Sequence, residues 1–132
     1  LPGMAIGTLP VARQLVEQCG QANAGLLLDS MHLYRSGGTA DDVRALPKGM
    51  VKYAQLCDVP LVSQFEEYAD EARFERLAPG DGELPLADYV AAVPTDVILG
   101  LEIPMRALAE KGMSAKDRLA PAVAKSRALL GG

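Results

Sequence analysis

Three short apolar runs, each with a polar side chain at or near its end, constrain the fold more than any other feature of the sequence. The runs are 25–29, 51–58 and 97–102. Runs this short and this apolar are typical of strands that are covered on both faces, as in a parallel sheet. Segments with helical patterns alternate with them, and this alternation favours right-handed crossover units. The sequence therefore predicts an α/β fold built on parallel βα units.

Helix signals separate the three predicted strands. Helices are predicted over 8–19, from 39 to about 47, within 63–77, over 86–93 and in the C-terminal segment. Thr39 is followed by two acidic residues, which is typical of a helix start. Two starts are open for the last helix. A helix capped by Ser114 would carry Pro121 in its interior, whereas a start near Asp117 or later would be less strained.

Length and composition exclude several classes of protein. The 132 residues allow one domain with a hydrophobic core, but a complete eight-fold α/β barrel takes roughly 250. The longest wholly apolar runs have about five residues, whereas a membrane-spanning helix needs roughly 20. No secretory signal pattern is visible and two cysteines are too few for a disulfide framework, so we expect free thiols and a cytoplasmic location. A net charge of −4 and 5% aromatic residues argue against a nucleic-acid partner.

The polar residues at the predicted strand ends indicate a metal site. Asp29, Gln55 and Glu102 lie at or near the carboxyl ends of the strands, where ligands gather in α/β folds. Side chains alternate along a strand, so the three oxygen donors converge if their faces point into a barrel. A single His excludes a three-His zinc site within the chain, and the oxygen donors suit Mg²⁺ or Mn²⁺. Each residue taken alone would more often be structural, so the prediction depends on the three together.

Nearby polar residues are candidate contacts for a substrate. His32 follows Asp29 on the loop expected to leave the strand, where it could contact a substrate or carry a proton. Arg35 and Arg76 offer a fixed fork of donors to a carboxylate, phosphate or hydroxyl. A lone His after a strand is also commonly an ordinary hydrogen-bonded residue. We interpret Asp58 as a structural residue on the loop side.

Four segments carry recognisable motifs in a fixed order. They are Leu28–Leu33 with D-x-x-H, Tyr53–Asp58 near h-x-H-x-x-D, Arg76–Gly82 with R-x-x-P-G-x-G, and Leu99–Ile103 with a strand ending in Glu. In this order and spacing they resemble the xylose isomerase-like sugar phosphate isomerase/epimerase superfamily, which includes the AP endonuclease family 2 type. The resemblance covers nearly the whole chain. It implies a (β/α)8 TIM barrel, of which residues 1–132 would form a single partial domain, the C-terminal half with about three strands.

The resemblance also implies roles for individual residues. Asp29, Gln55 and Glu102 would be metal ligands, while His32 and Arg76 would face the substrate. Family members use Mn²⁺, Mg²⁺, Co²⁺ or Zn²⁺, and here Mn²⁺ or Mg²⁺ is expected. Carboxylates at the metal also move protons beside a carbonyl in this family. Glu102 and His32 are therefore the candidate catalytic residues.

The sequence departs from the family pattern in two places. Gln55 stands where many members have His, which is similar to the 3-dehydroshikimate dehydratase branch. Arg106, shortly after Glu102, also resembles that branch and could hold a substrate carboxylate. The family further expects a metal-binding Glu on the preceding strand, and this ligand would lie upstream of residue 1.

The resemblance implies a divalent-metal-dependent isomerase or epimerase that acts on a sugar or sugar phosphate by proton transfer beside a carbonyl. Two alternatives remain open: a dehydratase of the 3-dehydroshikimate or inosose type, acting on a cyclic polyol or keto acid, and a barrel fragment without catalytic activity. DNA repair of the endonuclease IV type is disfavoured because it uses several zinc ions and several His. Expected partners are a small-molecule substrate, without nucleic acid or membrane, and either a homo-oligomer or the missing N-terminal half of the barrel.

Overall fold

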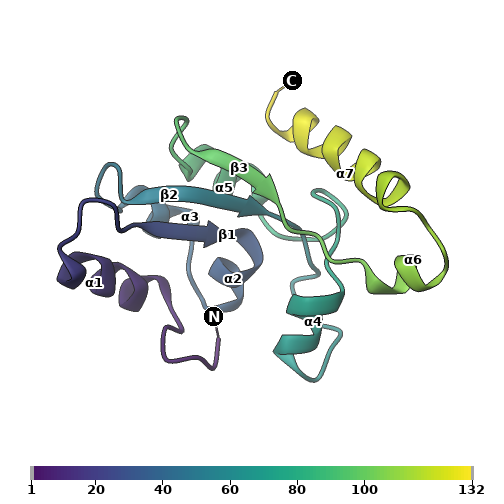
Figure 1. Cartoon of the computed structure of the whole chain (residues 1–132), viewed down its shortest axis with the longest axis horizontal. Coiled ribbons are helices and arrows are strands. Elements are labelled where there is room, and N and C mark those ends of the chain that lie inside the picture. Colours follow the sequence, from purple (N-terminus) through teal and green to yellow (C-terminus); the bar gives the residue numbers. More distant parts are fainter. Residues whose placement is uncertain (1, 132) are drawn as a thin grey trace.

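A three-stranded parallel sheet in the order β1-β2-β3 forms the centre of the computed structural model, which describes residues 2–131 (Figure 1). The strands are β1 (Leu26–Asp29), β2 (Val51–Leu56) and β3 (Ile98–Leu101). The helices are α1 (Leu9–Cys19), α2 (Ser30–Arg35), α3 (Ala40–Arg44), α4 (Tyr68–Phe74), α5 (Leu86–Ala92), α6 (Arg106–Glu110) and α7 (Ala115–Leu129). The three predicted strands and their parallel pairing are confirmed.

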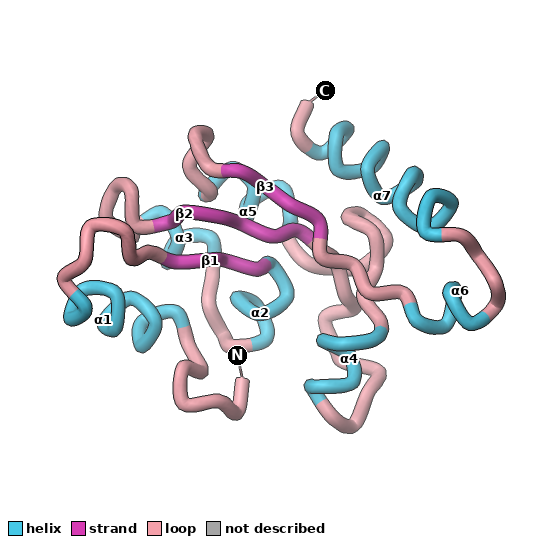
Figure 2. The backbone as a smooth tube through the Cα atoms, in the orientation of Figure 1, coloured by secondary structure: helices cyan, strands magenta, loops and turns pink. Residues whose placement is uncertain are grey.

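One face of the sheet packs against the core. Leu28, Ala54 and Leu56 are buried on this face, where Val43 of α3 and Tyr89 of α5 join the same hydrophobic cluster. Figure 2 shows α3 and α5 together behind the sheet. Removing these apolar side chains from water supplies the main driving force for this packing.

The opposite face is open in the part of the chain that the structure describes. Leu27, Tyr53 and Ile98 lie in one row across the three strands, and Leu27 is 57% exposed while Ile98 is 71% exposed. The apolar runs predict strands covered on both faces, whereas residues 2–131 cover only one. The sequence pattern records the burial of a side chain but not which segment buries it.

Helix ends follow the predicted capping signals. Thr39 forms a capping box with Asp42: its hydroxyl accepts from the Asp42 N–H at 3.2 Å, and its own N–H donates to the Asp42 carboxylate at 2.8 Å. Ser114 accepts from the Asp117 N–H at 3.2 Å, and the helix continues through Pro121. The earlier of the two starts is therefore correct for α7. No helix in residues 2–131 is long and apolar enough to cross a membrane.

The prediction that His32 lies on a loop is wrong. Asp29 ends β1 and at once caps α2, because its carboxylate accepts from the His32 N–H at 2.9 Å. His32 therefore lies in the first turn of a six-residue helix. Neither α2 nor the five-residue α6 is predicted, since helices this short show less than two turns of periodicity.

Asp58 organises the loop that follows β2. Its buried carboxylate accepts from the N–H groups of Val59 at 2.9 Å, Gly80 at 2.9 Å and Leu84 at 3.1 Å. A Cβ at Gly82 would lie 2.4 Å from the Asp58 Oδ1, so only glycine lets the turn pass this close. The structural interpretation of Asp58 is confirmed.

We expect Asp58→Ala to lower the free energy of unfolding by about 3 kcal/mol, because three backbone N–H groups, two of them in buried hydrogen bonds, lose their acceptor. Urea unfolding followed by far-UV circular dichroism measures the loss. Asp96→Ala is the matched control, since Asp96 is exposed, and it should change the stability by less than about 0.5 kcal/mol. Equal losses in both variants would contradict the structural role of Asp58.

Candidate functional site

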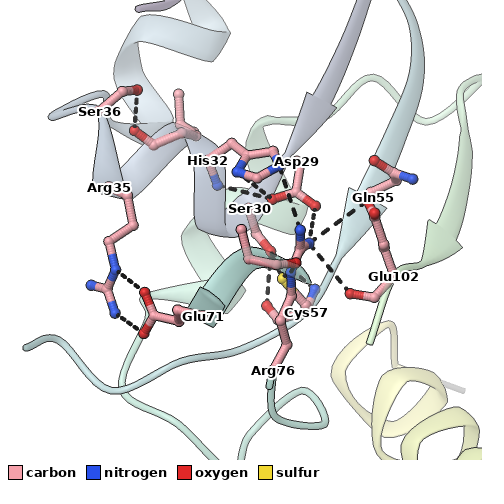
Figure 3. A network of polar contacts seen from close by, with 12 residues as sticks. Asp29, Ser30, His32, Arg35, Ser36, Gln55, Cys57, Glu71, Arg76 and Glu102 are labelled. Carbon is pink, nitrogen blue, oxygen red and sulfur yellow. Dashed lines mark hydrogen bonds and ion pairs between the residues drawn. The ribbon is translucent and has the colours of Figure 1, made fainter. Parts of the chain in front are cut away.

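The three strand-end residues gather at the carboxyl edge of the sheet (Figure 3). Asp29 is in register with Gln55, which is in register with Gly100. Glu102 follows β3 directly, and its N–H donates to the Leu56 carbonyl at 3.3 Å. Strand alternation puts Asp29, Gln55 and Glu102 on the open face of the sheet. The structure therefore brings together the three residues that the sequence singles out as metal ligands.

A buried hydroxyl locks the ends of β1 and β2 together. Ser30 Oγ donates to the Cys57 carbonyl at 2.8 Å and accepts from the Cys57 N–H at 3.0 Å. Both residues are fully buried. Burial also raises the pKa of the Cys57 thiol to about 11, so the thiol stays protonated and unreactive at neutral pH. This pair fixes the backbone from which Asp29 projects.

Arg76 lies between the two carboxylates. Its Nη1 is 2.9 Å from Asp29 Oδ2 and 3.7 Å from Glu102 Oε2, and it also donates to the Glu102 carbonyl at 3.4 Å. Its Nε donates to the Ala72 carbonyl at 2.9 Å. The arginine is 4% exposed. Burial raises the pKa of Asp29, and the adjacent guanidinium opposes this by stabilising the carboxylate.

His32 is held at the rim of this cluster. Its Nδ1 contacts the hydroxyl of Tyr68 and lies 4.0 Å from Asp29 Oδ1, while its Nε2 lies 3.5 Å from Arg76 Nη2. Burial, together with the charge of Arg76, lowers the pKa of His32 to about 4. The imidazole is therefore neutral at pH 7.

Two of the predicted substrate contacts are engaged elsewhere. Arg35 pairs with the buried Glu71 through Nε at 3.0 Å and Nη2 at 2.8 Å, and it donates to the carbonyls of Pro60 and Leu61 in the loop after β2. Figure 3 shows this pair apart from the strand-end cluster. Arg106 is exposed, with its guanidinium 3.9 Å from the centre of the Phe74 ring. Neither arginine lines the cavity described next, so their roles as substrate contacts stay predictions that this geometry does not favour.

A cavity of about 970 Å³ opens beside the cluster. It is lined by His32, Arg76 and Glu102 and by Tyr68 and Arg73 of α4. Tyr68 and Arg73 are not among the site residues predicted from the sequence. They lie in the helix predicted within 63–77, but they belong to no motif, and α4 ends at Phe74, before Arg76.

The donor set suits an oxygen-preferring cation in kind, but it does not complete a coordination shell. No group of three or more His, Cys, Asp and Glu side chains that could hold a metal ion occurs between residues 2 and 131. Two carboxylates and the Gln55 amide supply three oxygen donors of the roughly six that Mg²⁺ or Mn²⁺ takes. The side chain of Glu102 is 43% exposed, so its carboxylate is accessible from the cavity while one oxygen faces Arg76.

The chain matches no protein-family model. Among solved structures it resembles the IolI protein with a bound zinc atom, at a TM-score of 0.81 and 17% identity, over 97% of this chain and 45% of that one. A xylose isomerase domain protein from Alicyclobacillus acidocaldarius has a TM-score of 0.62 at 24% identity, over 91% of this chain and 44% of that one. A fusion of a xylose isomerase-like TIM barrel with 4-hydroxyphenylpyruvate dioxygenase is 27% identical at a TM-score of 0.65, over 74% of this chain and 16% of that one.

The chain belongs to the xylose isomerase-like TIM barrel proteins. Two curated relatives match 91 residues of this chain. They are 3-dehydroshikimate dehydratases, 33% identical in Pseudomonas aeruginosa and 26% identical in Pseudomonas putida over 91 residues, or 69% of this chain. The chain spans 14% of the length of these relatives. Its three parallel strands correspond to part of the xylose isomerase-like barrel.

The buried pair of Arg35 and Glu71 gives a prediction about stability. Arg35→Met should lower the free energy of unfolding by about 3 kcal/mol, because it leaves the buried Glu71 carboxylate without its partner. Urea unfolding measures the change, and Arg35→Met with Glu71→Met together should cost less than the sum of the single variants. Arg13→Met is the control, since the Arg13–Glu17 pair is exposed and should contribute about 0.5 kcal/mol or less. Additive losses would contradict a direct Arg35–Glu71 interaction.

Proposed function

We propose that this chain forms part of the active site of a divalent-metal-dependent dehydratase that acts on a cyclic hydroxy ketone carrying a carboxylate, of the 3-dehydroshikimate type. The observation that carries the proposal is the cluster of Asp29, Gln55 and Glu102 at the ends of three adjacent strands, beside a cavity with two arginines. The two dehydratase relatives support the reaction, and Gln55 in place of the more common His supports the branch.

Asp29, Gln55 and Glu102 would hold the cation through their side-chain oxygens. A divalent ion bound there would polarise the substrate carbonyl and stabilise the negative charge that develops on its oxygen. A further Glu ligand on a strand before residue 1 stays a prediction. Zinc is bound in the IolI structure, while the oxygen-rich donor set of this chain favours Mg²⁺ or Mn²⁺.

The residues of the chain divide the remaining work. Glu102, with an accessible carboxylate, would take the proton from the carbon beside the carbonyl and return it to the hydroxyl on the next carbon, which leaves as water while the carbon–carbon double bond forms. Arg76 stabilises the ionised form of Asp29 and orients its carboxylate, and neutral His32 adds no charge to the cluster. Arg73, exposed on the cavity wall, faces an anionic group of the substrate with a fork of donors.

Isomerases and epimerases of this family share the first chemical step, the removal of a proton beside a carbonyl. The likeness to IolI is a likeness of fold, at 17% identity, and it does not favour isomerisation over dehydration. The two reactions differ in whether water is lost. A direct assay of both products therefore separates them.

The metal site predicts Mn²⁺ binding that depends on the cluster. Glu102→Gln should weaken Mn²⁺ binding by about tenfold or more, because it removes a charged oxygen ligand. Titration followed by the electron paramagnetic resonance signal of free Mn²⁺ measures the affinity. Glu110→Gln is the matched control, an exposed carboxylate on α6 outside the cavity. If both variants weaken Mn²⁺ binding equally, the ion binds to exposed carboxylates in general, and the proposed metal site is refuted.

Turnover of 3-dehydroshikimate is the test of the reaction. In the natural full-length protein that contains this chain, supplied with Mn²⁺, we expect loss of water that extends the conjugation of the ring and changes its ultraviolet absorbance. Glu102→Gln should lower kcat by about 100-fold or more, the usual cost of removing a catalytic base. Interconversion of ketoses without loss of water would refute the dehydratase and favour the isomerase.

A further inference from the structure

Tyr68 lies against the single histidine of the chain. Its hydroxyl contacts Nδ1 of His32, and the two ring centroids are 5.8 Å apart. Tyr68 is in the first turn of α4 and His32 is in α2. The sequence motif that points to His32 gives no sign of this partner.

The contact between Tyr68 and His32 is supported by a second contact between the same two helices, α2 and α4, three residues further along each of them. Arg35 of α2 pairs with Glu71 of α4 through two hydrogen bonds, at 3.0 Å and 2.8 Å. The Nε of Arg76 also donates to the Ala72 carbonyl of α4. Because a two-point ion pair fixes direction as well as distance, α4 is set in one register on α2. Tyr68 is therefore presented to His32 by a rigid support.

The neighbours of the imidazole decide which nitrogen carries the proton. Nε2 faces Nη2 of Arg76 at 3.5 Å, and a guanidinium can only donate. Nδ1 faces the Tyr68 hydroxyl and, at 4.0 Å, the Asp29 carboxylate, both of which can accept. A doubly protonated ring would place a second cation against the Arg76 guanidinium, with two donors facing each other. The arrangement is satisfied only by a neutral ring with its proton on Nδ1.

We propose that Tyr68 holds His32 in the Nδ1–H tautomer by accepting a hydrogen bond from Nδ1–H. Because the Tyr68 oxygen is the acceptor in this bond, its own hydroxyl hydrogen points into the cavity and donates to an oxygen of the substrate. Tyr68 lines this cavity together with Arg73, Arg76 and Glu102. The substrate class is one with a carbonyl, hydroxyl or carboxylate oxygen within reach of α4. Contact with the substrate rests on the proposed function, whereas the tautomer of His32 does not.

The single histidine makes the tautomer directly measurable. In the ¹⁵N-labelled 132-residue chain, long-range ¹H–¹⁵N spectra at neutral pH should show a protonated Nδ1 and an unprotonated Nε2. Tyr68→Phe keeps the ring and removes the hydroxyl, so it should raise the population of the Nε2–H tautomer. Tyr34→Phe is the matched control, because the Tyr34 hydroxyl donates to the Pro85 carbonyl and not to the imidazole. It should leave the spectrum of His32 unchanged.

Two results would overturn the positioning role of Tyr68: a protonated Nε2 in the unaltered chain, or the same imidazole shifts before and after Tyr68→Phe. The spectrum requires no substrate. It therefore separates this inference from the proposed reaction, which fails if the full-length protein does not dehydrate 3-dehydroshikimate.

Steady-state kinetics tests the contact with substrate. Tyr68→Phe in the full-length protein should lower kcat/KM by about fivefold, the effect of one neutral hydrogen bond, while Tyr34→Phe should leave it unchanged. An unchanged kcat/KM in Tyr68→Phe would show that the hydroxyl does not touch the substrate. An equal fall in both variants would show a loss of packing and would also overturn the contact.

Discussion

The buried contact between Arg76 and Asp29 connects most of the parts that make up the site. Through its side chain and backbone, Arg76 reaches the end of β1, the Ala72 carbonyl in α4 and the Pro104 carbonyl after β3. Burying a lone guanidinium would be costly, but here the charge is paired and hydrogen-bonded. The same contact leaves room for a cation. A carboxylate has about four acceptor positions, and on Asp29 the Arg76 guanidinium and the N–H groups of His32 and Met31 take three of them.

Features that depend on the local pattern of the chain could be predicted from the sequence, whereas contacts between side chains far apart in the sequence could not. Strand runs and alternation along them are local, so Asp29, Gln55 and Glu102 were correctly placed at one edge of the sheet. The partners of His32 and Arg35 lie 36 residues away in each case. Nothing in the local pattern around Arg35 indicates that its guanidinium is taken by a buried glutamate. The prediction of a substrate contact followed from the residue type alone.

Short helices mark a second limit of the sequence. Asp29 ends a strand and caps a helix with the same residue, so the chain turns without any loop. Periodicity predicts elements of two or more turns and passes over this one. The consequence is chemical as well as structural. Placing His32 in α2 sets its ring against α4, where Tyr68 is available, and not on a mobile loop facing solvent.

Charge balance links the proposed cation to the proposed substrate. Among the described residues, the ionised forms of Asp29 and Glu102 outnumber Arg76 by one negative charge at the cluster. An anionic substrate would be repelled from that cluster, although Arg73, which also lines the cavity, would attract it. A divalent cation reverses the sign of the cluster, so the cation and the carboxylate of the substrate should each strengthen the binding of the other. A neutral His32 matters in this balance, because an imidazolium beside Arg76 would cancel the net negative charge of the cluster that attracts a cation.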